Sequence, residues 1–173
     1  MENGFVNPFA STYSMTSLEK ALKGGDGTEV ADSGTAATRK KRDVIVRGVF
    51  SVTVISAEDL PIVDLMGKAD PYVVLYMKKT GNKNKTRVVN DSLNPVWNQT
   101  FDFVVEDGLH DMLILEVWDH DTFGKDYMGR CILTLTKVIL EGEYNDTIPL
   151  DGSKSGKLSL HLKWMPQPIY RDA

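Results

Sequence analysis

Polar and apolar residues alternate with a period of two over most of the chain after Gly48. The clearest run covers residues 157–164, where every second residue is Leu or Trp and the residues between them are polar. Such alternation predicts a β-strand with one face on a core and the other in water. Residues 71–78 are apolar on both faces, which predicts a more central strand.

The same reasoning predicts eight strands, separated by turn signals such as Gly81-Asn82 and Asp151-Gly152. They are expected at residues 48–57, 71–78, 84–90, 99–105, 111–118, 128–135, 145–150 and 156–164. No convincing crossover helix joins any two of them, so the fold class is all-β, an eight-stranded antiparallel β-sandwich. The expected domain covers residues 44–166, with a tail at 167–173.

Residues 1–43 lack this period and are rich in Gly, Ser, Thr and Ala, which is typical of a flexible linker or arm. A short helix is expected at 16–23, capped by Thr16. The arm ends in the basic run Arg39–Arg42. This run is either a solvated hinge or a contact with anionic headgroups.

The composition fits one soluble domain with a core: 173 residues, 42% hydrophobic, 25% charged and a net charge of −4. The only cysteine, Cys131, lies in an alternating apolar run. We expect it to be a core residue, which suits a reducing compartment. No apolar stretch approaches the ~20 residues that span a bilayer.

Two long polar loops concentrate aspartate. The first, residues 58–70, holds Asp64 and Asp70, and the second, residues 119–127, holds Asp119, Asp121 and Asp126. If the loops converge, five carboxylates form a patch of the hard oxygen ligands that calcium prefers. Aspartate is also common in turns for structural reasons, so spacing alone leaves both readings open.

Three motifs resemble the C2 domain family, in family order, and the match runs from about Gly48 to Trp164. The motifs are Gly67-Lys68-Ala69-Asp70-Pro71-Tyr72-Val73, Asn94-Pro95-Val96-Trp97-Asn98-Gln99-Thr100-Phe101, and Trp118-Asp119-His120-Asp121 followed by Asp126-Tyr127-Met128-Gly129. The final strand, with nothing equivalent before Gly48, suggests the circularly permuted type II strand order.

The resemblance implies a calcium site that holds two ions. Its ligands would be Asp64, Asp70, Asp119, Asp121 and Asp126, supplemented by the backbone oxygens of Val63 and His120. Within the family, the chain resembles the last C2 domain of plant synaptotagmins and extended synaptotagmins. These are anchored in the endoplasmic reticulum and tether it to the plasma membrane.

The expected function is calcium-dependent binding of anionic phospholipid membranes, containing phosphatidylserine or phosphoinositides, from the cytosolic face. Apolar residues at the expected loop tips, Leu65, Met66 and Phe123, suggest shallow insertion.

A basic strand offers a second lipid site for phosphoinositide headgroups. Its residues are Lys78, Lys79, Lys83, Lys85 and Arg87. The alternative is an ordinary solvated or edge-protecting face. Nucleic acid is disfavoured, because the aromatic residues follow core patterns and do not interleave with the basic ones.

Two other classes of function stay open. A calcium-independent protein-interaction scaffold is the main alternative, and the five aspartates argue against it. An enzyme is not expected, because the sequence has no Gly-x-Ser-x-Gly elbow and no His/Cys metal cluster.

Overall fold

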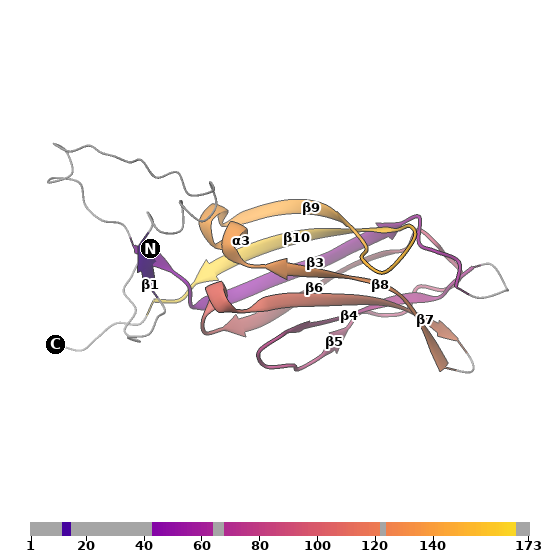
Figure 1. Ribbon diagram of the computed structural model, residues 1–173, viewed down its shortest axis with the longest axis horizontal. Coiled ribbons are helices and arrows are strands. Elements are labelled where there is room, and N and C mark those ends of the chain that lie inside the picture. Colours follow the sequence, from indigo (N-terminus) through magenta and orange to yellow (C-terminus); the bar gives the residue numbers. More distant parts are fainter. Residues whose placement is uncertain (1–11, 15–42, 64–67, 122–123, 169–173) are drawn as a thin grey trace, which may run out of the picture.

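The computed structural model describes residues 12–14, 43–63, 68–121 and 124–168. Its elements are β1 (Thr12–Ser14), β2 (Asp43–Ile45), β3 (Gly48–Glu58), β4 (Pro71–Met77), β5 (Asn84–Lys85), β6 (Val96–Val105), η1 (Gly108–His110), β7 (Met112–Asp121), β8 (Gly124–Thr134), α3 (Thr136–Glu141), β9 (Glu143–Pro149) and β10 (Lys157–Pro166). Two four-stranded antiparallel sheets, β6-β3-β10-β9 and β5-β4-β7-β8, form the sandwich (Figure 1). The predicted all-β architecture is confirmed.

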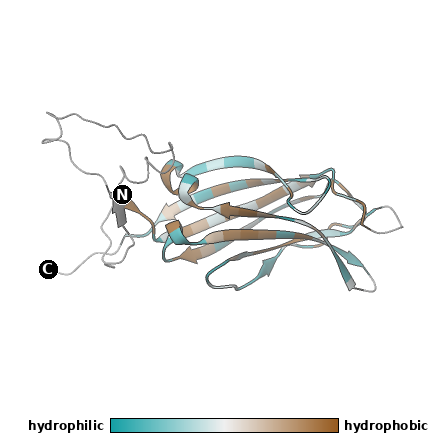
Figure 2. Ribbon diagram, in the orientation of Figure 1, coloured by the Kyte–Doolittle hydropathy of each residue, from teal (hydrophilic) through white to brown (hydrophobic). Residues whose placement is uncertain are grey.

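The last strand, β10, lies between β3 and β9. It pairs with β3 along its whole length, from Lys157 opposite Glu58 to Pro166 opposite Gly48. This is the permuted order that the resemblance implies. Inward positions such as Val52 and Leu160 are fully buried. The resulting alternation of hydrophobic and hydrophilic bands along the strands is visible in Figure 2.

The strand predicted at 84–90 is much shorter, because its residue pairing with β4 ends at Lys85. The Thr86 N–H still donates to the Val73 backbone oxygen at 2.9 Å, but side chains supply other acceptors. The Val73 N–H donates to Thr86 Oγ1 at 3.0 Å. The Arg87 N–H donates to Gln99 Oε1 at 3.0 Å. A period-two pattern cannot reveal this substitution of side-chain for backbone acceptors.

The loop predicted at 119–127 is also different. The β7 strand continues through Asp121, and β8 begins at Gly124, so the two form a hairpin. Asp119, Asp121 and Asp126 therefore belong to strands. Their positions relative to one another are set by the register of the hairpin.

The other end of the sandwich carries α3 and β2, neither of which was predicted. Val44 and Val46 are buried in the main core. The Trp164 Nε1–H donates to the Ile45 backbone oxygen at 3.2 Å. Within the arm expected to be flexible, β1 pairs antiparallel with β2. The helix expected at 16–23 lies outside the described residues.

Candidate metal and lipid site

The aspartates of β7 continue the core-facing row of that strand beyond the end of the core. Leu115 and Val117 are fully buried, and Asp119 and Asp121 follow at the same two-residue spacing. The register places Asp126 of β8 directly opposite Asp119. Directly opposite residues of antiparallel strands point to the same face.

A β-bulge in β8 is the reason that Asp126, and not Tyr127, faces Asp119. Gly129 pairs with Val117 but Tyr127 pairs with Trp118, so Met128 is the extra residue. Without the bulge Tyr127 would stand opposite Asp119, because a one-residue slip moves every side chain to the other face.

Asp70 joins this group from the start of β4. Its backbone N–H donates to Asp119 Oδ1 at 2.8 Å, and its backbone oxygen accepts from the His120 N–H at 3.0 Å. Its own carboxylate accepts from the Asp91 N–H at 2.7 Å. Two strand ends and the loop at Asp91 are thus held together through aspartate oxygens.

Asp119 is only 1% exposed, whereas Asp70, Asp121 and Asp126 are half-buried. A buried carboxylate is costly unless it is compensated by hydrogen bonds or a cation. Oxygen-only donors on strand ends match the preference of calcium for carboxylate ligands. The residue types therefore fit a calcium ion.

The described residues do not by themselves complete a metal site. Within residues 43–63, 68–121 and 124–168, no group of three or more His, Cys, Asp or Glu side chains is placed to hold a metal ion. Asp64, the fifth expected ligand, lies outside the described residues. Val63 packs against the core and His120 is exposed.

The expected membrane-inserting residues Leu65, Met66 and Phe123 also lie outside the described residues. Sequence reasoning missed Ile62, which is 63% exposed beside that segment. Its position within the predicted loop 58–70, two residues before Asp64, was the available signal.

All five residues of the expected basic strand are exposed. Lys85 stands opposite Val74 of β4, and Lys83 Nζ lies 5.0 Å from the centroid of the Tyr76 ring. Arg87 is different, because its guanidinium donates to the backbone oxygen of the buried Trp97. Arg87 therefore also links β6 to the chain beyond β5.

An aromatic row on the outer face of β4, β7 and β8 was not anticipated. Glu116 accepts from the Tyr76 hydroxyl at 3.1 Å and from Trp118 Nε1–H at 3.2 Å. Lys125 Nζ lies 4.5 Å from the Trp118 ring centroid. The premise that aromatic residues do not interleave with basic ones is wrong here. The available sequence signal was position: Tyr76 and Trp118 directly follow the inward-facing residues Leu75 and Val117, so they face outward.

The described part of the chain contains no helix that is long and apolar enough to cross a membrane.

Comparisons with known proteins agree with this architecture. Residues 48–150 match the model of the C2 domain family. Synaptotagmin-5 of Arabidopsis thaliana is 75% identical over 171 residues, which is 99% of this chain and 30% of that protein. Extended synaptotagmin-1 of Homo sapiens is 35% identical over 127 residues, 69% of this chain and 11% of that protein.

Two of the similar solved structures come from extended synaptotagmins. A single C2 domain of plant Extended Synaptotagmin 1, its domain A, has a TM-score of 0.63 at 30% identity, covering 70% of this chain and 97% of that one. The calcium-bound pair of C2 domains of Extended-Synaptotagmin 2 has a TM-score of 0.64 at 29% identity, covering 71% of this chain and 47% of that one.

The chain spans less than a third of the length of the two plant synaptotagmins that it matches over 99% of its own length. The fold, the motifs and the family match together show that the chain belongs to the C2 domain family.

Proposed function

We propose that this C2 domain binds anionic phospholipid membranes in a calcium-dependent manner through its aspartate-bearing end. The observation that carries the proposal is the alignment of Asp119, Asp121 and Asp126 on paired strand ends, with Asp70 hydrogen-bonded to Asp119. A related two-domain structure of Extended-Synaptotagmin 2 is calcium bound, which supports the choice of metal.

The proposed mechanism is electrostatic. Without a cation the five aspartates give this end about five negative charges, which repel an anionic leaflet. Two calcium ions, when bound, would offset four of those charges and offer coordination positions to lipid oxygens. Asp119 would anchor the site, because its burial and its bond to the Asp70 N–H fix its carboxylate. Leu65, Met66 and Phe123, with the exposed Ile62, would supply apolar contacts to the bilayer surface.

A second contact is proposed for the basic residues around β5. Lys83 and Lys85, with Lys78 and Lys79, would attract phosphoinositide headgroups, each cation near the surface contributing ~1 kcal/mol. The neighbouring Tyr76 and Trp118 rings hold Lys83 and Lys125 over their faces. This contact does not require calcium.

The chain matches only 30% of the length of Synaptotagmin-5, so we place the domain in a longer protein. Its role there would be a peripheral membrane-docking module at contacts between endoplasmic reticulum and plasma membrane. We assign it no catalytic step.

Vesicle co-sedimentation tests the proposal. Vesicles with phosphatidylserine should retain the protein in calcium and release it in chelator, whereas phosphatidylcholine vesicles should retain little in either. Equal binding with and without calcium would favour the alternative, a calcium-independent scaffold.

A further inference from the structure

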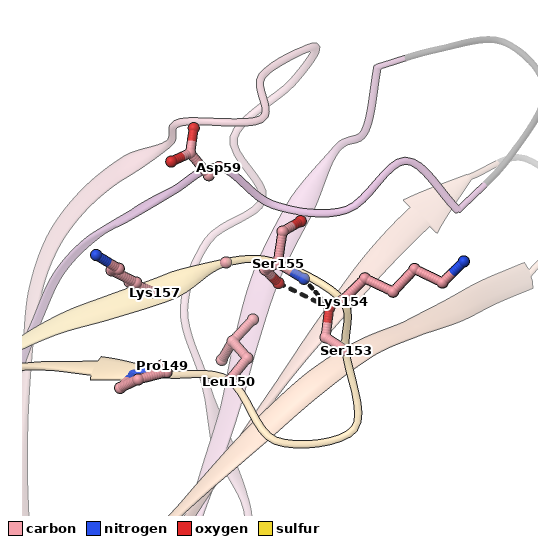
Figure 3. Close-up of a pocket in the computed structure, with 8 residues that line it drawn as sticks. Asp59, Pro149, Leu150, Ser153, Lys154, Ser155 and Lys157 are labelled. Carbon is pink, nitrogen blue, oxygen red and sulfur yellow. Dashed lines mark hydrogen bonds between the residues drawn. The ribbon is translucent and has the colours of Figure 1, made fainter.

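A hollow of about 340 Å³ lies beside the loop that joins β9 to β10 (Figure 3). One wall is the loop itself, and the other includes Asp59, which follows β3. The loop lies at the aspartate-bearing end of the sandwich. Lys157 pairs with Glu58 at the end of β3, and Asp151 bridges to Arg130 of β8.

The loop has a fixed shape. Asp151 and Arg130 exchange two backbone hydrogen bonds, of 2.7 and 3.1 Å, and the Leu150 N–H donates to the Gly156 oxygen at 2.9 Å. The Ser153 hydroxyl donates to the Ser155 backbone oxygen at 2.7 Å. Gly156 has a φ of 109°, and a Cβ there would lie 2.9 Å from Leu150 Cδ1. A preorganised loop loses little further freedom when it binds a ligand.

The side chains around the hollow have both signs of charge. Lys154 and Lys157 are exposed, and in Figure 3 their amines extend in opposite directions from the loop. Ser153 and Ser155 lie between them. Asp59 is the acidic residue of the lining. The Ser153 hydroxyl proton is already donated to the Ser155 backbone oxygen, so the donors left for a phosphate are the Ser155 hydroxyl and the amines. The carboxylate suits a cation.

We propose that this hollow binds a phosphodiester headgroup that also carries an ammonium, as in phosphatidylethanolamine or its soluble headgroup. The phosphate would accept from the Ser155 hydroxyl and from whichever lysine amine, Lys154 or Lys157, turns toward it, and the ammonium would lie on Asp59. A headgroup without a cation, such as glycerol phosphate, would meet the Asp59 charge unpaired. For a lipid in a bilayer the inference rests on the proposed membrane docking of this end. For the soluble headgroup it does not.

The first experiment uses no membrane. Amide chemical shifts of the full chain are followed by NMR in chelator while glycerophosphoethanolamine or glycerol phosphate is added. Saturable shifts of Ser153, Ser155 and Gly156 are expected, with tighter binding of glycerophosphoethanolamine. Lys154→Gln with Lys157→Gln should weaken it at least about tenfold, since loss of a hydrogen bond to a charged group costs about a factor of ten or more.

Two controls sharpen this test. Lys137→Gln with Lys163→Gln removes the same charge near α3, at the opposite end, and should leave the affinity unchanged. Asp59 has a φ of 54°, a conformation that asparagine adopts readily, so Asp59→Asn should fold normally. It should remove the preference for glycerophosphoethanolamine over glycerol phosphate. Absent loop shifts, equal affinities of the parent for both probes, or an unaffected lysine variant would overturn the proposal.

The second experiment identifies the source of the headgroup. Phosphatidylcholine vesicles with phosphatidylserine, with and without phosphatidylethanolamine, are co-sedimented in calcium. A phosphatidylethanolamine-dependent gain that Lys154→Gln with Lys157→Gln removes supports the lipid source. Soluble binding without that gain supports a free headgroup. If the parent binds no vesicle in calcium, the membrane-docking function fails while the NMR result still decides the hollow.

Discussion

The backbone N–H of Asp70 donates to Asp119 Oδ1 at 2.8 Å, across the ends of β4 and β7. One buried carboxylate thereby fixes the start of one strand and belongs to the proposed metal site. An asparagine at position 119 keeps an oxygen for the Asp70 N–H but loses the charge. This separates the structural role of the side chain from its role toward a cation.

Calcium should raise the thermal stability of the domain, because a ligand that binds only the folded state shifts unfolding by mass action. At a calcium concentration of about 100 times Kd the gain is roughly 2.7 kcal/mol, or on the order of 8 °C in Tm. Asp119→Asn with Asp121→Asn should abolish this gain, measured by differential scanning fluorimetry in calcium and in chelator.

The matched control is Asp102→Asn with Asp146→Asn, which removes the same charge away from the site. Both residues lie on the β6-β3-β10-β9 sheet. The control variant should keep the full calcium response. A calcium gain that survives in the Asp119/Asp121 variant would show that the site is assigned to the wrong residues.

Among the basic residues around β5, Lys83 and Lys85 should contribute to lipid binding alone, whereas Arg87 should also contribute to stability. Lys83→Gln with Lys85→Gln should lower binding to phosphoinositide vesicles in chelator by roughly tenfold or more, at ~1 kcal/mol per cation, with Tm nearly unchanged. Arg87→Ala should also lower Tm, since its guanidinium binds the backbone oxygen of buried Trp97. Unchanged vesicle binding by the lysine variant, or an unchanged Tm for Arg87→Ala, would contradict this division.

The sandwich could be predicted because its strands bury one face each. The alternation in 157–164 and 48–57 leads directly to β10 and β3, whose inward residues such as Leu160 and Val52 are fully buried. The aspartates could be selected by residue type and by their place in the C2 motifs. Their arrangement could not be predicted in the same way.

The arrangement depends on features without a periodic signature. The extra residue Met128 turns Asp126 toward Asp119, and only the hairpin register reveals it. The hydroxyl of Thr86 replaces a backbone acceptor and shortens β5. Tyr76 and Trp118 are apolar enough to resemble core residues, yet Glu116 holds both by hydrogen bonds on the outer face.

Cys131 should be unreactive in the folded protein. It is 1% exposed, and burial raises the pKa of its thiol to about 12, helped by Asp151 and Asp146. At pH 8 the thiolate fraction is then on the order of 10⁻⁴, so alkylation by iodoacetamide should be slower than for a free thiol by roughly 10³-fold. The rate should rise about tenfold per pH unit between pH 7 and 9. Labelling of native protein at the rate of the urea-unfolded chain would contradict this.

The boundary between arm and sandwich should lie immediately before Val44. Removing residues 1–38 deletes β1, whose three-residue pairing with β2 should contribute only about 1 kcal/mol. Removing residues 1–46 also deletes Val44 and Val46, each buried in the core and worth roughly 1.5–3 kcal/mol. It further removes the oxygens of Ile45 and Val46 that accept from Trp164 Nε1–H and the Gly108 N–H. Urea unfolding should therefore show a small loss for the first truncation and at least about 4 kcal/mol for the second. The shorter deletion leaves every residue from Arg39 onward in place. Similar losses of unfolding free energy for the two truncations would therefore mean that β1 is an integral part of the domain.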